Sequence, residues 1–491
     1  MTDTSVTLSA GADSQVAESL GARNRLVITL LLISTFVVIL NETIMGVALP
    51  SLMRDLGIPA SSAQWLTAAF MLTMAVVIPI TGFLLQRFNT RPLFITAMSL
   101  FSAGTLIAAV APGFEVLLIA RIVQACGTAI MFPLLITTVI TLVPPATRGR
   151  MMGNISIVIS VAPAIGPTIS GLILTVLDWR WMFIIVLPIA IASLIVGGSL
   201  MKNVTTPRKT RVDVLSVILS AVGFGGLVYG LSTLGTATNP LESWLPLGIG
   251  LLSLLVFVLR QLWLQRDDRA LLDLRTFTSG TFTFSIVMFA ISMMALFGTL
   301  ILLPIYVQTV LGIDTLTAGL LLLPGGLIMG LLAPWVGRIY DRIGPTALLV
   351  SGSVIVSAVL WSMTMLDAQS SIWLVLAAHV TLSVGLALLF TPLFTASLAA
   401  VRPQLYSHGS AIVGAVQQLA GAAGTALFVS VMSSQALRLL AGGSSRVEAT
   451  ASGVHLALLY GAAISVFAIP AAFFIRKTAL PKGVDAAPAG H

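Results

Sequence analysis

The sequence predicts an all-α integral membrane protein with fourteen transmembrane helices, and three observations support this fold class. Apolar residues make up 57% of the 491 residues, whereas charged residues make up only 9%. Apolar runs long enough to cross ~30 Å of hydrocarbon as a helix recur along the chain. The Lys and Arg residues between these runs gather on one side of the predicted membrane, which is the usual bias of membrane proteins.

The chain begins with a polar tail, residues 1–25. Asp3, Asp13 and Glu18 lie in it, with no basic flank before a short apolar core, so a solvated tail is predicted rather than a signal peptide. Fourteen apolar runs follow, each read as one membrane-spanning helix. They cover about residues 26–48, 62–84, 92–111, 114–136, 151–173, 181–201, 213–235, 244–264, 281–306, 315–338, 346–366, 372–395, 407–433 and 454–475.

The distribution of basic residues predicts the orientation. With both termini inside the cell, twenty Lys and Arg residues fall on the cytoplasmic side and four fall outside, namely Arg54, Arg180, Arg438 and Arg446. An odd number of spans would have disrupted this bias. The sequence pI near 10.2 therefore reflects membrane orientation, and no nucleic acid partner is expected. We expect a multi-pass protein of the cell inner (plasma) membrane, in contact with lipid and present as a monomer.

Two loops repeat the same pattern. Gly82-Phe-Leu-Leu-Gln-Arg-Phe-Asn-Thr-Arg-Pro92 joins spans two and three, and Gly337-Arg-Ile-Tyr-Asp-Arg-Ile-Gly-Pro345 joins spans ten and eleven. This displacement predicts two duplicated six-helix halves with a two-helix insertion, and a substrate site between the halves near the bilayer midplane. The predicted parts are a tail (1–25), a first half (26–205), the insertion with its flanking loops (206–275), a second half (276–475) and a C-terminal cytoplasmic tail (476–491).

Glu42 and Arg121 are the acidic and the basic residue that fall well inside apolar runs. A charge at membrane depth costs on the order of 3 kcal/mol, so such residues usually mark an ion or substrate path. Glu42 lies seven residues before Leu49 at the outer end of span one, and Arg121 lies seven residues after Phe114 at the outer end of span four. Both are therefore about 10 Å deep at ~1.5 Å per residue, and we expect them to meet. A structural clamp formed by Arg121 with Glu42 as its satisfied partner is the alternative.

Several kinds of chemistry are not expected. No loop is long enough for a soluble catalytic domain, and none contains a nucleotide-binding glycine loop with its lysine, so direct use of ATP is not expected. No residues cluster as metal ligands or as a nucleophile with its base. The single cysteine, Cys126, lies in an apolar run and is expected to pack there. We therefore predict neither an enzyme nor a cofactor or metal.

Five motifs together carry a resemblance to a known family. They are Leu40-Asn-Glu-Thr-Ile-Met-Gly-Val-Ala-Leu-Pro50, Gln64-Trp-Leu-Thr67, Arg121-Ile-Val-Gln-Ala-Cys-Gly127, Ala162-Pro-Ala-Ile-Gly-Pro-Thr-Ile-Ser-Gly171 and Trp179-Arg-Trp181. With the repeated loops, they resemble the fourteen-span drug:proton antiporters of the major facilitator superfamily, and among these the lincomycin-resistance-type exporters of bacteria. The resemblance runs from about Leu40 to beyond Gly424. It implies proton-driven export of drugs, with Glu42 and Arg121 in proton coupling.

The chain departs from the family pattern at several positions, among them Asn89 in the first loop and Ala125 in span four, where the family usually has glycine. Gln86 stands where the family's first loop usually has an aspartate, so we expect Gln86→Ala to have little effect. Asp341 keeps the pattern in the second loop. In span one the usual acid aligns with Asn41 and the acid follows at Glu42, which turns the side chain by about 100°. The residues of the two loops with an expected conformational role are Gly82, Arg87, Arg91, Gly337, Asp341 and Arg342.

The prolines and glycines of span five indicate the direction of transport. Its prolines bend a helix and its glycines allow close helix approach. Bends of this kind are common in membrane helices, but the match to the family's antiporter motif favours a specialised hinge or seal. The residues concerned are Pro163, Gly166, Pro167 and Gly171.

His379, about seven residues into span twelve, either carries a proton or is a neutral histidine bonded between helices. Candidate substrate-binding residues are polar, aromatic or flexible side chains that suit varied lipophilic ligands. The same residues could face lipid or pack helices. They are Asn41, Trp65, Phe70, Met74, Phe132, Phe289, Met293 and Phe297.

These observations predict a proton-coupled antiporter that exports small lipophilic drugs or toxic compounds from the cytoplasm by alternating access. A dedicated exporter of one endogenous metabolite, lipid or siderophore with the same fold is the first alternative. A membrane scaffold or sensor without transport is a more distant one, because it needs no titratable Glu42.

Overall fold

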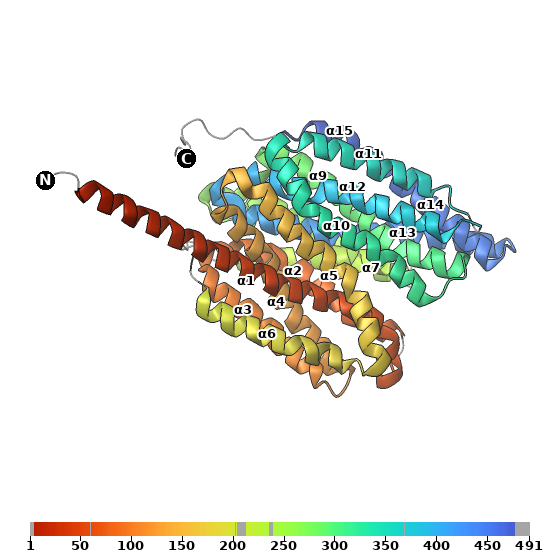
Figure 1. Ribbon diagram of the computed structural model, residues 1–491. Coiled ribbons are helices and arrows are strands. Elements are labelled where there is room, and N and C mark those ends of the chain that lie inside the picture. Colours follow the sequence, from red (N-terminus) through yellow and green to blue (C-terminus); the bar gives the residue numbers. More distant parts are fainter. Residues whose placement is uncertain are drawn as a thin grey trace.

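The computed structural model describes residues 4–58, 60–201, 203, 213–234, 239–367 and 369–476. Over these residues the chain is a bundle of long helices (Figure 1). The helices are α1 (Thr4–Leu56), α2 (Ala60–Arg87), α3 (Thr90–Ala109), α4 (Phe114–Leu142), α5 (Arg148–Val176), α6 (Arg180–Leu200), α7 (Val214–Thr233), α8 (Leu241–Leu264), α9 (Gly280–Ile305), α10 (Thr315–Ile343), α11 (Thr346–Met363), α12 (Ile372–Ala399), α13 (Tyr406–Ala441), α14 (Arg446–Val466) and α15 (Ala468–Phe473).

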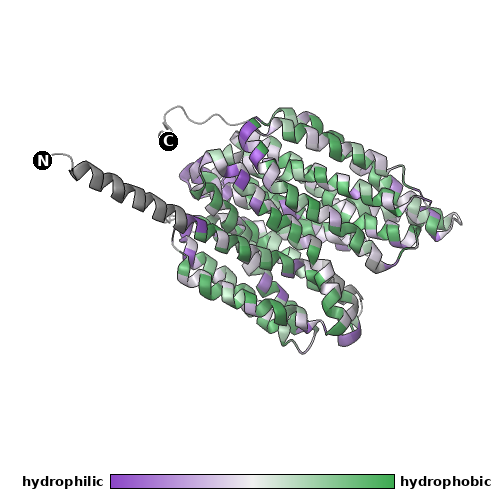
Figure 2. Cartoon of the chain, viewed as in Figure 1, coloured by the Kyte–Doolittle hydropathy of each residue, from purple (hydrophilic) through white to green (hydrophobic). Residues whose placement is uncertain are grey.

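Fourteen segments among the described residues are long and apolar enough to cross a membrane, which confirms the predicted number. Figure 2 shows hydrophobic residues along the lengths of the helices and hydrophilic residues mainly toward their ends. The boundaries differ most in α1, which begins at Thr4 rather than near 26 and ends at Leu56 rather than near 48. Helix α13 continues to Ala441 rather than ending near 433. The last span also breaks at Phe467, between α14 and α15.

The helices form two groups. We call α1–α6 the N group and α9–α15 the C group. Most of these helices pack against members of their own group, but α5 and α10 pack most extensively against each other, across the boundary between the groups. Figure 1 shows the N group in red to yellow below the C group in green to blue. Helices α7 and α8, the central pair, pack on each other, and α7 also contacts α2 of the N group and α13 of the C group. The predicted domain boundaries stay predictions, since the connection 204–212 and the tail from 477 lie outside the described residues.

The central pair is joined at one end by an ion pair. The Arg260 guanidinium on α8 donates to both carboxylate oxygens of Asp213, at 2.7 and 2.8 Å, and Asp213 also caps α7 by accepting from the Ser216 backbone N–H. The hydrogen bonds from Arg260 are the main reason that the pKa of Asp213 lies well below its usual range. This pairing fixes the two helices relative to each other near the loop that leads into α9.

The N and C groups are closely packed at the end of the bundle that carries the α2–α3 and α10–α11 loops, which we call the α2–α3 end. A Cβ atom on Gly153 of α5 would lie 2.5 Å from the Ala333 carbonyl oxygen of α10, so the two backbones approach without room for a side chain. Toward the other end, the α1–α2 end, a Cβ on Gly171 of α5 or on Gly319 of α10 would meet nothing within 4 Å. Neither glycine therefore packs closely against a neighbouring helix.

One cluster at the α1–α2 end ties the N group together. The Trp179 indole N–H donates to Asp55 at 2.7 Å, and Arg180 donates both to Asp55 at 3.2 Å and to the Ala111 carbonyl at 3.1 Å. The hydrogen bond from Trp179 is the main cause that lowers the pKa of Asp55. The Trp-Arg-Trp motif thus joins the ends of α1, α3 and α6.

Candidate functional site

Arg121 is the centre of a buried polar network in the N group. Its side chain on α4 is fully buried. Its Nη1 donates to Asn41 Oδ1 on α1 at 3.3 Å and to Gln124 Oε1 at 3.0 Å, while Nε donates to the Leu66 carbonyl of α2 at 3.4 Å. The guanidinium lies 4.1 Å from the centre of the Phe70 ring, a cation–π distance. Three helices therefore hold one charge.

The network continues from Gln124 to a third neighbour of α4. Gln124 Nε2 donates to Thr105 Oγ1 on α3 at 2.8 Å, so both ends of the Gln124 amide are engaged. Two buried donors remain without a partner among the described residues, Arg121 Nη2 and Asn41 Nδ2. Buried donors of this kind usually find an acceptor, so an additional group is expected beside Arg121 in at least one state of the protein.

Glu42 does not pair with Arg121, contrary to the expectation from their equal depth. Its side chain is partly exposed, and in the described part of the chain it accepts no hydrogen bond and forms no ion pair. It does interact electrostatically with Arg121. The reason is the step of about 100° between neighbouring helix positions: Asn41, rather than Glu42, bonds the guanidinium.

His379 lies in the contact between α12 and α10. It is buried, its Nε2 lies 3.3 Å from the Leu322 carbonyl oxygen, and a Cβ on Gly325 would lie 2.6 Å from the neighbouring Ser383 Oγ. Among the described residues, His379 forms no hydrogen bond or ion pair with Glu42 or Arg121. The geometry fits the alternative of a histidine bonded between helices, and proton transfer by His379 stays a prediction.

The candidate ligand residues of the N group occupy different surroundings. Phe70 and Met74 are buried on α2, where Met74 Sδ lies 3.8 Å from Gln418 Nε2 of α13, across the boundary between the groups. Trp65 is 40% exposed and stacks on Tyr229 of α7 at 5.7 Å between ring centres. Trp65 therefore contacts the central pair.

An aromatic cluster spans the two groups. Phe132 of α4 meets Phe394 of α12 edge to face at 6.1 Å, and Phe394 meets Phe289 of α9 at 4.9 Å. Met293 is buried on α9, and Phe297 would lie 3.2 Å from a Cβ on Gly421 of α13. These side chains fill the region between the groups with apolar and polarisable surface, and their role in binding a substrate stays a prediction.

Asp341 joins the groups at the α2–α3 end. Its Oδ1 accepts from the Gly149 backbone N–H at 2.8 Å and its Oδ2 from the Arg150 backbone N–H at 2.9 Å. These donors lie in the first turn of α5, where the free N–H groups and the helix dipole favour an anion. Gly337 permits this contact, because a Cβ there would collide with the Gly149 carbonyl oxygen. A C-group carboxylate thus caps an N-group helix.

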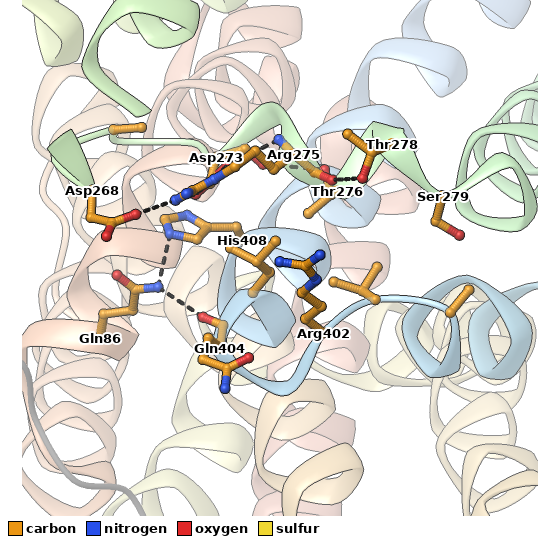
Figure 3. A pocket seen from close by; sticks show the side chains of 14 residues that line it. Gln86, Asp268, Asp273, Arg275, Thr276, Thr278, Ser279, Arg402, Gln404 and His408 are labelled. Carbon is orange, nitrogen blue, oxygen red and sulfur yellow. Dashed lines mark hydrogen bonds and ion pairs between the residues drawn. The ribbon is translucent and has the colours of Figure 1, made fainter. Parts of the chain in front are cut away.

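Gln86 also bridges the groups, although it lacks the charge of the aspartate that is usual at this position. Gln86 Nε2 donates to the Gln404 carbonyl at 3.3 Å and lies 2.8 Å from His408 Nε2, both in the C group (Figure 3). Nearby, a Cβ on Gly82 would lie 3.2 Å from the Ala411 Cβ of α13. The prediction that Gln86→Ala has little effect is therefore revised: an amide replaces the acid with neutral hydrogen bonds.

The basic residues of the two loops differ in their surroundings. The Arg91 Nε donates to the Gly198 carbonyl at 2.8 Å, near the end of α6, so it fixes contacts within the N group. Arg87 ends α2, and Arg342 is exposed in the last turn of α10.

Span five is one continuous helix, α5, through Pro163 and Pro167. Gly166 lies against α1, where an added Cβ would be 3.0 Å from the Thr43 Cβ and closer still to its hydroxyl. Gly171, by contrast, faces open space. The expectation of close packing therefore holds for Gly166 and is wrong for Gly171, although the adjacent Ser170 is buried and its hydroxyl donates to Met182 Sδ of α6.

Sequence reasoning missed some of the residues that complete these contacts. His408 at the start of α13 had no recognised pattern, and Tyr406, whose hydroxyl accepts from Arg148 at 3.5 Å, is equally unmarked. Gln124 could have been identified from its place one turn after Arg121. No group of three or more His, Cys, Asp or Glu that could hold a metal occurs in the searched part of the chain.

Comparisons with known proteins agree with this geometry. A family model described as Major Facilitator Superfamily matches residues 31–425. An MFS-type transporter of Bacillus subtilis strain 168, YcnB, described as uncharacterised, is 43% identical over 93% of this chain and 96% of its own. The lincomycin resistance protein LmrB of Listeria monocytogenes is 38% identical over 92% and 96%. The crystal structure of the human organic anion transporter MFSD10 has a TM-score of 0.62 at 14% identity, with 91% and 99% covered.

Proposed function

Because the chain belongs to the Major Facilitator Superfamily, and is thus a membrane transporter rather than an enzyme, we propose that it exports small lipophilic compounds in exchange for protons. The observation that carries the proposal is the pair of Glu42 and Arg121, an electrostatically coupled carboxyl and guanidinium without an ion pair. The 38% identity to a lincomycin resistance protein supports drugs as cargo.

The orientation is part of this proposal. The α2–α3 end carries the arginines of both repeated loops, and the excess of basic residues supports a cytoplasmic position for it. The described conformation, in which the N and C groups pack closely at that end, would then be the outward-facing stage of alternating access. A site between the groups would open to the other side when the contacts at the α2–α3 end separate.

The chemistry of the pair suits proton exchange. Glu42 is free to gain or lose a proton without breaking a hydrogen bond in this conformation, and its charge is felt by Arg121. Arg121 Nη2 and Asn41 Nδ2 are available to a carboxylate or to an acceptor atom of the cargo. A cationic or hydrogen-bond-donating group of the cargo beside Glu42 would favour its ionised form, so cargo binding would release the proton.

Purified protein in liposomes tests the function. With a pH gradient imposed, lincomycin and several unrelated lipophilic drugs are expected to accumulate in the acidic compartment, and adding drug is expected to release protons in proportion. Accumulation of one compound without competition from the others would favour a dedicated exporter. A protein that moves none of the tested drugs and no protons would refute the proposal.

Arg121→Lys is expected to slow export roughly tenfold, although the charge is kept. Lysine is a point charge and cannot bond Asn41, Gln124 and the Leu66 carbonyl in one plane. Initial rates of drug export by Arg121→Lys and Arg121→Ala would be compared at matched protein amounts. If the lysine variant transports normally and the alanine variant does not, a point charge suffices and the argument from the planar guanidinium is wrong.

Asp341→Asn is expected to shift the population toward the inward-facing state by about fivefold, the effect of losing ~1 kcal/mol of charge-assisted capping on α5. Spin labels on cysteines at the exposed positions Phe88 and Ile343, which flank the α2–α3 end, would report the distance. Cys126→Ser removes the chain's single native cysteine. Asp55→Asn is the control, since Asp55 bonds within the N group. Equal distance distributions for wild type and Asp341→Asn would contradict the latch.

A further inference from the structure

A polar pocket of about 480 Å³ lies at the α2–α3 end, apart from Glu42 and Arg121. Its walls come from α2, from the loop between the central pair and α9, and from the turn between α12 and α13 (Figure 3). His408, the second buried histidine of the described chain, lines it with only 3% of its side chain exposed. Nothing in the proposed exchange at Glu42 uses this histidine.

The hydrogen bonds of Gln86 define the protonation state of His408. A carbonyl oxygen can only accept, so the Gln86 nitrogen that faces the Gln404 carbonyl at 3.3 Å is the amide NH2 group. The same nitrogen lies 2.8 Å from His408 Nε2. An NH2 group has two hydrogens and donates to both. His408 Nε2 must therefore accept, which requires the neutral imidazole with its hydrogen on Nδ1.

A protonated His408 cannot keep this arrangement. Both nitrogens of an imidazolium are donors, so two donors would face each other across the 2.8 Å contact. Turning the Gln86 amide would satisfy His408 but would place the amide oxygen against the Gln404 carbonyl. Either way, protonation loses one of the two hydrogen bonds that link α2 of the N group to the C group at this point.

The charged groups around His408 come from two segments. Asp268, Asp273 and Arg275 lie on the loop before α9, and Arg402 lies on the α12–α13 turn; α2 faces His408 with the neutral Gln86. Asp273 and Arg275 act on His408 electrostatically with opposite signs. Both aspartates are already bound to Arg275. No carboxylate is therefore free to replace Gln86 as a partner without breaking an ion pair.

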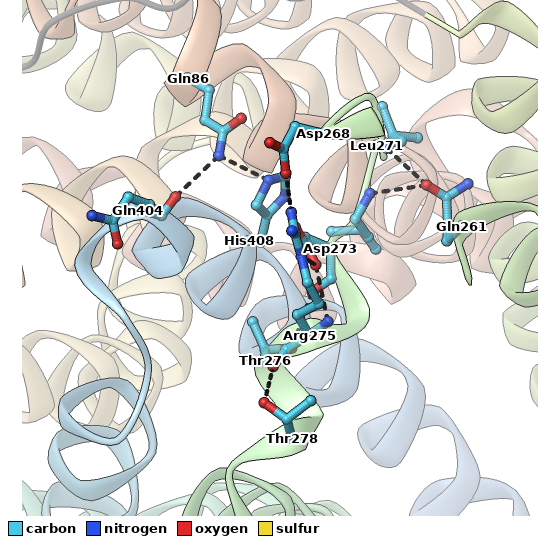
Figure 4. A network of polar contacts seen from close by, with 11 residues as sticks. Gln86, Gln261, Asp268, Leu271, Asp273, Arg275, Thr276, Thr278, Gln404 and His408 are labelled. Carbon is cyan, nitrogen blue, oxygen red and sulfur yellow. Dashed lines mark hydrogen bonds and ion pairs between the residues drawn. The ribbon is translucent and has the colours of Figure 1, made fainter. Parts of the chain in front are cut away.

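The central pair holds this loop in place (Figure 4). Gln261 of α8 is fully buried and its Oε1 accepts from the Leu271 backbone N–H at 2.7 Å and from that of Leu272 at 3.3 Å. Its Nε2 donates to Ser216 of α7 at 2.8 Å. Hydrogen bonds from α8 thus hold the loop that lines the pocket beside His408.

We propose that His408 is a second protonation site of this transporter, on the cytoplasmic side, and that its protonation releases the Gln86 contact and favours opening at the α2–α3 end. The central pair positions the loop before α9, which lines the pocket beside His408. The inference rests on the alternating-access part of the proposed function. It would make the opening toward the cytoplasm respond to cytoplasmic acidity, independently of proton binding at Glu42.

Distance measurements test this without any transported substrate. The cysteine pair at Phe88 and Ile343 would report the α2–α3 end, and a pair at the exposed Val176 and Met365 the α1–α2 end, both with Cys126→Ser. Buffers at about pH 8 and about pH 5 bracket the titration of an ordinary histidine. Acidification is expected to raise the fraction open at the α2–α3 end severalfold, with a matching closure at the other end.

Two substitutions test whether the response to pH depends on the contact between His408 and Gln86. His408→Gln keeps an acceptor near the position of Nε2 but cannot titrate, so the closed state should persist at both pH values. Gln86→Glu places a carboxylate opposite the imidazole, so acidification should now tighten the contact through an ion pair rather than loosen it. His455→Gln, at an exposed histidine of α14, is the matched control and should keep the wild-type response.

The proposal is overturned if the wild-type distances do not change with pH, or if His408→Gln opens on acidification as the wild type does. Should His408→Gln fail to fold, an unreversed response of Gln86→Glu overturns it equally. Failure of drug and proton exchange in liposomes with an intact pH-dependent opening would instead refute the antiport function alone. The two ideas are thus separable by experiment.

Discussion

Glu42→Gln is expected to abolish proton-driven export, lowering its rate by about tenfold or more, which corresponds to at least ~1.4 kcal/mol. The substitution keeps the size and polarity of the side chain but removes the proton that it can carry. Since Glu42 makes no hydrogen bond or ion pair with the described residues, the packing of α1 should survive. Export driven by a pH gradient would be measured in liposomes.

A second measurement separates coupling from cargo binding. Exchange of labelled for unlabelled drug without a pH gradient needs no net proton transfer, so Glu42→Gln should retain it. Glu115→Gln, at an exposed carboxyl in the first turn of α4, is the matched control and should export normally. Undiminished gradient-driven export by Glu42→Gln would remove Glu42 from the mechanism.

Gly166→Leu is expected to abolish drug exchange or to let protons leak, because α5 and α1 touch at this glycine. A Cβ there would already lie 3.0 Å from the Thr43 Cβ, and Thr43 directly follows Glu42. Misfit at a packed contact costs ~1–3 kcal/mol, which changes the populations of a two-state transporter severalfold or more. Passive proton flux and drug export would be measured in the same liposome preparation.

The chain supplies its own control for this experiment. Gly171 lies on the same helix, but a Cβ at this position meets nothing within 4 Å. Gly171→Leu adds the same side chain to the same apolar helix. It should therefore leave drug export and passive proton flux unchanged. Wild-type behaviour of Gly166→Leu, or equal damage from both substitutions, would show that the α1–α5 contact does not seal the exchange route.

The repeated loops show where a family pattern was informative and where it was not. Asp341 was recognised from its motif, and the structure gives it the expected contact between the groups, with the α5 backbone. Gln86 departed from the motif and was expected to matter little, yet it bonds across the same boundary. A motif records which charge is usual at a position; it does not record that a different partner, His408, can make a neutral substitute effective.

The sequence by itself determined the all-α membrane class, the fourteen spans and the isolated charges Glu42 and Arg121, because hydrocarbon thickness and the cost of burying charge act on each segment separately. Only the tertiary structure decided that Asn41 rather than Glu42 bonds Arg121, that Gly166 but not Gly171 is packed, and that His408 meets Gln86. These contacts depend on how helices distant in sequence are rotated about their axes. A rotation of one residue, about 100°, changes the partner of a side chain without changing any feature of the local sequence pattern.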